Sequence, residues 1–218
     1  MIEEVLPPGA RWGEAFRPRA EVELFPEESA YVAGAVERRR LQFASVRACA
    51  RDALAALGRP AAPLVPGRGG APTWPSGVVG SMTHCTGYHA AAVAHSSELA
   101  ALGIDAEPHA PLTEGVLESI TGPAERASLP SGEGVAWDRV LFSAKESVYK
   151  AWFPATGRWL GFRDVEIALA EDGGITAVLL VPGPRVAGRR VERFRGRWTV
   201  GSGLLLTSVS VPVEPAAP

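Results

Sequence analysis

The spacing of apolar and polar residues divides the chain into helical and extended stretches. From about residue 29 to residue 57 the apolar residues recur every three or four positions, which predicts a long helix. Its apolar face comprises Val36, Phe43, Val46, Ala50, Leu54 and Leu57. Pro26 with two following glutamates fits the start of this helix, and Gly58 fits its C-terminal end.

A second strong helical pattern runs from about residue 137 to residue 152. Its apolar face comprises Val140, Leu141, Ala144, Val148 and Ala151. Shorter helical pieces are expected at residues 113–120 and 123–129. The Pro- and Gly-rich residues 59–77 are expected to form a loop, and residues 213–218 a frayed tail.

Short apolar runs predict strands in two groups, one before and one after the second helix. The first group covers residues 78–82, 88–95 and 99–105, and its short links predict an antiparallel meander. The second group covers residues 163–170, 175–181, 193–200 and 204–211, with Asp172-Gly173-Gly174 as a hairpin turn. A further short strand is expected around Val22-Glu23-Leu24.

The order helix, strands, helix, strands predicts an α+β fold with two lobes, residues 1–104 and 105–218. Each lobe would combine a small antiparallel sheet with a long helix. A crevice between two lobes is a common place for a small-molecule site.

Composition narrows the function classes. The 218 residues carry a formal net charge of −2, which provides no overall basic field for nucleic acid. Arginines cluster instead at residues 38–51 and 185–197, a distribution that favours a small polyanion. The N-terminus is no signal peptide and no apolar run is long enough to cross a membrane, so we expect a cytoplasmic protein without membrane contact. Cys49 and Cys85 have no metal-type spacing and are expected to be reduced thiols, with a disulfide between them as the alternative.

The segment Gly103-Ile-Asp-Ala-Glu-Pro108 carries the clearest chemical signal. Asp105 and Glu107 lie two residues apart at the end of an apolar run, so in a strand both carboxylates point to one side. Like charges held this close repel unless they are solvated or share a cation. A hard divalent ion such as Mg²⁺, held by carboxylates and substrate phosphates, is the economical interpretation.

Glu146 and Lys150 lie four residues apart on the second helix, which puts them on one face. They could form a solvated ion pair, or Glu146 could complete a three-carboxylate cation site with nearby lysines neutralising phosphate oxygens. Thr83 and His84 follow a predicted strand, where a hydroxyl and an imidazole would face a cleft.

Three segments together resemble the 4′-phosphopantetheinyl transferases, especially the surfactin-synthetase-activating and enterobactin type and its actinobacterial members. They are Gly80-Ser-Met-Thr-His-Cys85, Gly103-Ile-Asp-Ala-Glu-Pro108 and Phe142-Ser-Ala-Lys-Glu-Ser-Val-Tyr-Lys-Ala151. The resemblance extends over about residues 26–162 and is specific in the order and separation of the three segments. It implies the fold of that family, with two lobes related by a pseudo-twofold axis, and transfer of phosphopantetheine from coenzyme A to a serine of an acyl or peptidyl carrier protein with Mg²⁺.

The resemblance also implies roles for individual residues. Asp105, Glu107 and Glu146, with the Ala106 backbone, match the metal-binding positions, and Glu146 is the expected general base. Lys150 is expected to orient the leaving phosphate. The positions that match coenzyme A contacts are Arg39, Arg47, Thr83, His84, Lys145, Lys150 and Trp159.

Two positions in the coenzyme A site stay open. An ideal helix rotates Arg39 and Arg47 by about 80° relative to each other, so Arg40 is an alternative to Arg39. Close relatives carry lysines in the loop that here reads Pro66-Gly-Arg-Gly-Gly70, where Arg68 alone supplies charge.

The carrier protein is expected to dock on Leu112, Val116 and Leu117, and the enzyme to act as a monomer. Two other function classes remain: a Mg²⁺-dependent phosphohydrolase acting on a nucleotide-type substrate, and a non-enzymatic coenzyme A-binding module. The first would release phosphate without a protein acceptor, and the second would tolerate loss of Glu146.

Overall fold

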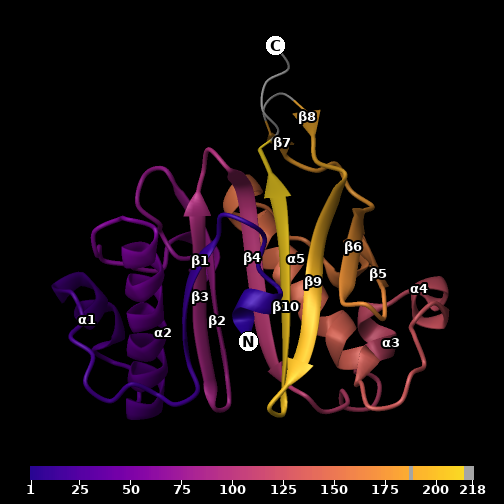
Figure 1. The fold of residues 1–218 in the computed structure, drawn as a ribbon, viewed down its shortest axis with the longest axis horizontal. Helices are drawn as coiled ribbons and strands as arrows, with labels where there is room; N and C mark the ends of the chain where they lie inside the picture. Colours follow the sequence, from indigo (N-terminus) through magenta and orange to yellow (C-terminus); the bar gives the residue numbers. More distant parts are fainter. Residues whose placement is uncertain (187–188, 214–218) are drawn as a thin grey trace.

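Residues 1–186 and 189–213 are described by the computed structural model, and within them two main antiparallel sheets each pack against a long helix (Figure 1). The first sheet has the strand order β1-β3-β2, with β1 at Arg11–Ala15, β2 at Val78–Cys85 and β3 at Tyr88–His95. The second has the order β4-β10-β9-β6-β5. Its strands are β4 (Leu99–Pro108), β5 (Val165–Leu169), β6 (Gly174–Leu179), β9 (Arg193–Gly201) and β10 (Leu204–Pro212).

Helix α2 (Glu37–Ala56) covers the first sheet and helix α5 (Trp137–Thr156) covers the second, which is the expected α+β class. Shorter elements complete the described chain: α1 (Pro26–Val32), α3 (Val116–Ile120), α4 (Pro123–Ala127), the ribbon β7 (Arg185–Val186) and β8 (Arg189–Arg190), and 3₁₀ turns at Ile2–Glu4, Arg68–Gly70 and Phe162–Asp164. No helix among the described residues is long and apolar enough to span a membrane.

Strand β4 packs on both of its faces. Its side chains alternate, so Leu102, Ile104 and Ala106 face a core that they share with β3 and the N-terminal 3₁₀ turn. The opposite face, which includes Ala101, packs against α5. One edge of β4 pairs with β10, and we call the other its free edge because no strand ladder forms there among the described residues. At this free edge the N–H groups of Ile104 and Ala106 donate to the hydroxyls of Ser81 and Thr83 on β2, both at 3.1 Å. The two sheets therefore meet edge to edge along β2 and β4.

The expected three-strand meander is wrong in its last strand. β2 and β3 pair as predicted, but β4 pairs with β10 of the second sheet. The short links indicated a hairpin of β3 with β4, whereas β1 occupies the edge of β3 that β4 would have taken. The division predicted after residue 104 falls inside β4, and the division into two lobes stays a prediction.

Two N-terminal expectations are also wrong. The helix predicted from about residue 29 to residue 57 is interrupted between Val32 and Glu37, and residues 22–24 form no strand. The first strand is instead β1, which the sequence pattern did not indicate. Its Gly13 lies so close to α2 that an added Cβ would come 2.4 Å from the carbonyl oxygen of Cys49. Glycine is therefore needed at this position, although glycine is otherwise uncommon inside strands.

The remaining elements agree with the pattern, with shifted ends. Strand β4 ends at Pro108, and the turn at Asp172-Gly173 joins β5 to β6. Gly58, after α2, and Gly157, after α5, have φ angles of 73° and 62°, as expected for helix ends. The small ribbon of β7 and β8 was not predicted. Of the expected tail, residues 214–218 lie outside the described residues.

Candidate active site

Helix α5 and strand β4 run antiparallel with matched spacing. Four helical residues rise about 6 Å and two strand residues about 6.7 Å, so every fourth position of α5 meets every second position of β4. Arg139 meets Glu107, Ser143 meets Asp105, and the backbone of Ser147 meets Gly103. A Cβ on Gly103 would come 1.9 Å from the Ser147 carbonyl oxygen, so this contact requires glycine. The register presents both β4 carboxylates to one face of α5.

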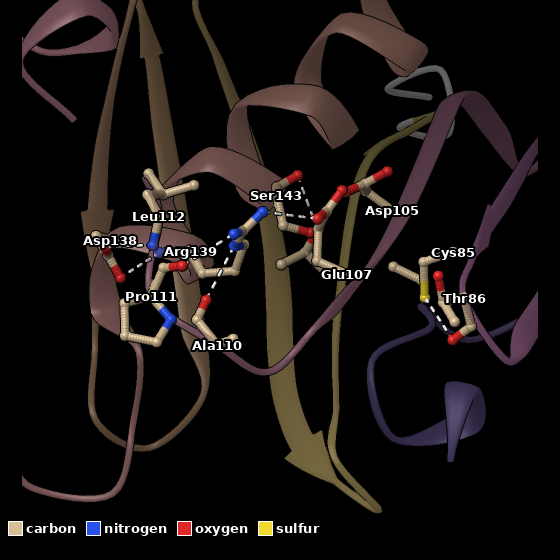
Figure 2. A network of polar contacts seen from close by, with 12 residues as sticks. Cys85, Thr86, Asp105, Glu107, Ala110, Pro111, Leu112, Asp138, Arg139 and Ser143 are labelled. Atoms are coloured by element: carbon tan, nitrogen blue, oxygen red, sulfur yellow. Dashed lines mark hydrogen bonds and ion pairs between the residues drawn. The ribbon is translucent and has the colours of Figure 1, made fainter. Parts of the chain in front are cut away.

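Asp105 is held by three donors. Its side chain is buried, and Oδ1 accepts from Lys150 Nζ at 2.7 Å and from the Thr83 hydroxyl at 3.3 Å. Oδ2 accepts from the Ser143 hydroxyl at 2.8 Å (Figure 2). Lys150 is therefore paired with Asp105, and among the described residues it forms no ion pair with Glu146, the four-residue partner considered from the sequence.

Ser143 belongs to a buried hydroxyl network behind the site. Its Oγ lies 2.9 Å from Thr207 Oγ1, which lies 2.7 Å from Ser147 Oγ. Thr207 is directly opposite Asp105 in the β4–β10 pair. Because all three hydroxyls are buried and bonded to one another, the donor to Asp105 has a fixed position.

Glu107 is half-buried and accepts from Arg139 Nη1 at 3.0 Å. Burial raises the pKa of its carboxyl, and the nearby Asp105 charge raises it further, while Arg139 opposes the shift. Burial also raises the pKa of Glu146 on α5, with additional contributions from Asp105 and Glu107. The three carboxyl groups therefore act on one another electrostatically, and a shared cation at this place stays a prediction.

The donor set fits a hard cation without forming a closed cage. No group of three or more His, Cys, Asp or Glu side chains in the described part of the chain has the arrangement of a preformed ion site. Mg²⁺ usually takes one or two carboxylates and completes its shell with water and substrate phosphate, so an open carboxylate cluster suits it. The Ala106 side chain faces the core and its N–H is bonded to Thr83. Since N–H and C=O of a paired residue point to the same edge of an antiparallel strand, the Ala106 carbonyl lies on the free edge of β4.

A cavity of about 300 Å³ opens beside this cluster. Helix α2, strand β2 and the loop after the 3₁₀ turn at residues 68–70 form one side, and α5 forms the other. The lining includes Arg39, Phe43, Arg47, Gly69, Thr83, His84, Glu146, Tyr149, Lys150 and Phe153. Cations on the first side thus face a glutamate and a lysine on the second.

Arg47 is the most constrained of these cations. Its Nε and Nη2 both donate to the carbonyl oxygen of Leu64, at 3.2 and 3.1 Å, and its guanidinium carbon lies 3.4 Å above the Phe43 ring. The Leu64 N–H donates in turn to the buried carboxylate of Glu28, at 2.9 Å. Burial lowers the pKa of Arg47 to about 10, which still leaves it charged at neutral pH. Its guanidinium therefore sits at the cavity wall in a fixed orientation.

Arg39, and not Arg40, is the second arginine of the cavity. Arg39 Nη1 lies 3.3 Å from His84 Nε2, and both residues line the cavity. Arg40 donates to the carbonyl oxygen of Ala35 at 3.1 Å and is absent from the lining. Burial lowers the pKa of His84, and the neighbouring Arg39 charge lowers it further, so the imidazole is neutral at pH 7.

The glycine-rich loop contributes shape more than charge. Gly69 has a φ of 64°, and a Cβ there would come 2.3 Å from the Phe153 ring. Gly69 and Gly70 line the cavity, whereas Arg68 does not, and its guanidinium lies near Gly157 at the end of α5. Arg68 therefore lies outside the cavity lining, and its contact with coenzyme A stays a prediction.

A second cavity, of about 140 Å³, adjoins the first at Glu146 and Tyr149. Trp159 forms part of its wall and is 76 % exposed, with its ring 5.1 Å from that of Tyr149. Lys145 also borders this cavity, but its ammonium is buried and points elsewhere. It donates to Glu125 at 2.9 Å and to the carbonyls of Phe162 and Val165 at 2.7 and 2.8 Å. With all three hydrogens used, the Lys145 ammonium holds α4 and β5 against α5 and does not face a ligand.

The remaining predicted residues lie as follows, and the docking role of Leu112, Val116 and Leu117 stays a prediction. Cys49 and Cys85 are free thiols, and burial beside Glu107 and Asp105 raises the pKa of Cys85 to about 12. Leu112, Val116 and Leu117 are half-buried, and Leu117 packs against the core of the second sheet. The C-terminal arginines do not line either cavity.

The sequence analysis missed Arg139, Ser143, Ser147, Tyr149 and Thr207. A signal for three of them was present: Arg139, Ser143 and Ser147 recur every fourth residue on the helix that also carries Glu146 and Lys150. Thr207 has no such signal, because only the strand register brings it to Asp105.

The sequence is similar to known proteins over most of its length. The family model described as the 4′-phosphopantetheinyl transferase N-terminal domain matches residues 27–94, and that of the 4′-phosphopantetheinyl transferase superfamily matches residues 101–200. The chain is 54% identical to 4′-phosphopantetheinyl transferase Svp of Streptomyces mobaraensis, over 97% of this chain and 89% of that protein. It is 46% identical to Npt of Nocardia iowensis, over 96% and 99%, and 48% identical to PptT of Mycobacterium tuberculosis, over 84% of each; both carry the same enzyme name.

Proposed function

The chain belongs to the 4′-phosphopantetheinyl transferase superfamily, and we propose that it transfers the 4′-phosphopantetheine group of coenzyme A to a serine of an acyl or peptidyl carrier protein. The main support for this site is that both cavities are lined by Glu146, which lies near the carboxyl groups of Asp105 and Glu107. A cationic cavity suits the phosphates of coenzyme A, and a narrow aromatic one suits its pantetheine arm.

The phosphate-binding groups are proposed to be Arg39, Arg47, His84 and Lys150. The arginines are oriented before any ligand arrives, which lowers the entropic cost of binding a polyanion. His84 is neutral, so it offers one hydrogen bond without adding to the positive charge. Thr83 is proposed to act indirectly, by holding Asp105 and the Ala106 N–H. Tyr149 and Trp159 are proposed to flank the pantetheine arm.

Asp105, Glu107 and Glu146, together with the Ala106 carbonyl, are the residues proposed to hold Mg²⁺ with the coenzyme A pyrophosphate. When bound, Mg²⁺ supplies charge neutralisation on the phosphoryl oxygens. Lys150 is shared between this cluster and the phosphate cavity, since it contacts Asp105 and lines the cavity. That position suits a residue that stabilises charge on the leaving adenosine 3′,5′-bisphosphate.

Glu146 is the proposed general base. In the transfer, the serine oxygen of the carrier protein bonds to the phosphorus of the phosphopantetheine, and the bond from that phosphorus to the adenosine bisphosphate oxygen breaks. The serine proton passes to the Glu146 carboxylate, directly or through one water.

We also propose a docking side for the carrier protein, an oligomeric state and a cellular compartment. The carrier protein approaches from the side of Trp159 and the second cavity, where an exposed aromatic residue adjoins Glu146. The enzyme is proposed to act as a monomer. The free thiols are in keeping with a reducing compartment such as the cytoplasm.

The test is intact-mass measurement of an apo carrier protein after incubation with the enzyme, coenzyme A and MgCl₂. We expect the carrier to gain one phosphopantetheine, and the gain to disappear with EDTA and in Asp105→Ala. Release of phosphate or nucleotide from coenzyme A without any gain on several carriers would favour a phosphohydrolase. Binding of coenzyme A without turnover on any carrier would favour a binding module.

A further inference from the structure

Arg139 connects the end of strand β4 to helix α5 through three separate contacts (Figure 2). Its Nη1 donates to Glu107 Oε2, its Nε to the carbonyl oxygen of Ala110, and its Nη2 to the carbonyl oxygen of Pro111, each at 3.0 Å. One planar guanidinium thus fixes a carboxylate and the chain segment that follows it.

The neighbouring contacts tighten the same connection. Asp138 accepts from the Leu112 N–H at 2.8 Å through Oδ2 and from the Arg139 N–H at 2.8 Å through Oδ1. His109 Nε2 accepts from the Ala136 N–H at 3.1 Å. The start of α5 is therefore bonded to residues 107–112 at several points, and Arg139 is the one that reaches a carboxylate of the site.

The geometry points to Arg139 as a positioning residue that holds Glu107 in the orientation needed to bind the divalent ion. The inference rests on the proposed function, because it assumes that Glu107 is a metal ligand. Arg139 donates to Glu107 in the same way that Ser143, one helical turn later on α5, donates to Asp105. Both carboxylates thus have a donor on the same helix, and the Arg139 guanidinium bonds to one oxygen of Glu107, Oε2.

A lysine cannot reproduce this arrangement. Its ammonium could reach Glu107, but it has no rigid fork that also bonds two backbone carbonyls. The carbonyl contacts matter because they fix the guanidinium itself, and loss of an outer partner of a metal ligand typically costs about 10–100-fold in metal affinity or activity. Orientation, and not charge alone, is therefore the contribution that we assign to Arg139.

The test compares the parent enzyme with Arg139→Ala and Arg139→Lys. Arg197→Ala is the matched control, because Arg197 Nη2 donates to the carbonyl oxygen of Asp172 at 2.9 Å on an exposed surface that lines neither cavity. Two quantities are measured: binding of Mn²⁺ to the coenzyme A complex by electron paramagnetic resonance, and the Mg²⁺ concentration that gives half-maximal transfer. Thermal unfolding reports whether each variant is folded.

For Arg139→Ala we expect Mn²⁺ affinity to fall at least about tenfold, with a similar rise in the half-maximal Mg²⁺ concentration. Transfer at saturating Mg²⁺ should recover most of the parent rate, and Arg139→Lys should restore only part of the affinity. Parent-like ion affinity in folded Arg139→Ala, or full restoration by lysine, would overturn the inference. A parent enzyme that transfers phosphopantetheine without a divalent ion would overturn the metal site itself, and the inference with it.

Discussion

The α2 side of the main cavity, here called the cationic wall, and the carboxylates Asp105, Glu107 and Glu146 beside that cavity, here called the acidic wall, are organised in different ways. On the α2 side, Arg39 and Arg47 lie eight residues apart on one helix, and Arg47 is oriented by the backbone of a loop. On the α5 side, Asp105 and Glu107 lie on a strand and are oriented by side chains of the facing helix. The cationic wall therefore depends on the loop at Leu64, whereas the acidic wall depends on the register between α5 and β4.

This difference teaches where substitutions should act. Changes on the acidic wall should affect the chemical step and metal use, because its carboxylates lie at the reacting phosphate in the proposed complex. Changes on the cationic wall should affect coenzyme A affinity. The predictions below separate the two walls, beginning with the largest expected effect.

Glu146→Gln should abolish most of the transfer on the acidic wall while leaving coenzyme A binding largely intact. Loss of a general base typically lowers the rate by about 10²–10⁴-fold, and loss of a metal ligand adds to this. The measurement is kcat with an apo carrier protein, alongside coenzyme A binding by calorimetry. Glu166→Gln, at an exposed position of β5, is the control. Comparable turnover in Glu146→Gln and the parent would refute the assignment.

Arg39→Ala should act on the cationic wall and raise the KM for coenzyme A with little change in kcat. A charge-assisted hydrogen bond contributes about 1.5–3 kcal/mol, which corresponds to about a 10–150-fold change. Arg40→Ala is the matched control, because Arg40 is the next residue on α2 but does not line the cavity. Equal effects of the two substitutions would show that the helix acts only through its general positive charge.

Gly103→Ala tests the register between α5 and β4. The new methyl group would overlap the Ser147 carbonyl, so α5 must shift away from β4. We expect the free energy of unfolding to fall by about 1–3 kcal/mol, as for other overpacked sites. We also expect lost transfer activity at temperatures where the variant is still folded. Gly34→Ala serves as a control, since nothing lies within 4 Å of a Cβ there. Parent-like stability of Gly103→Ala would mean that the contact is not tight in solution.

The smallest expected effect is a shift in the titration of His84. Its pKa lies below the ordinary value because of burial and then the Arg39 charge, so in the parent the imidazole becomes protonated only at a pH lower than usual. Removing the Arg39 charge should raise this pKa toward its ordinary value. The pH titration of the His84 ring signals by NMR in the parent and in Arg39→Ala measures the shift. An unchanged or lowered pKa in the variant would contradict the contact.

The residues of the acidic wall could be proposed from the sequence because they lie close together along the chain. Asp105 and Glu107 are two residues apart in one strand, and Glu146 and Lys150 are one turn apart in one helix. The supporting residues were not readable in the same way. Thr207 reaches Asp105 only through the pairing of β10 with β4, about a hundred positions along the chain.

Lys145 shows how local reasoning fails when a side chain is buried. It stands beside Glu146 in the sequence, and a lysine there reads as a phosphate ligand. On the helix it points into the core, where Glu125 and two carbonyls satisfy its ammonium. Glu125 could not be identified as its partner because it lies in a short helix whose position is set by tertiary packing.

The fold class followed from the order of elements, but the sheet membership of β4 did not. Local pattern predicts that a segment is a strand, while its partner depends on interactions distant in sequence. Strand β1 was missed for a related reason. Its close packing against α2 requires a glycine at position 13, and this glycine weakens the strand pattern in the sequence.

The double packing of β4 has a consequence for how the molecule unfolds. One face of this strand belongs to the core shared with β3 and the N-terminus, and the other belongs to the core of α5. Unfolding of either half would strip apolar surface from the same strand, so the two halves should melt in a single cooperative transition, without a half-folded intermediate. Asp105 and Glu107 lie on that strand, so these two carboxylates keep their positions only in a molecule in which both halves are folded.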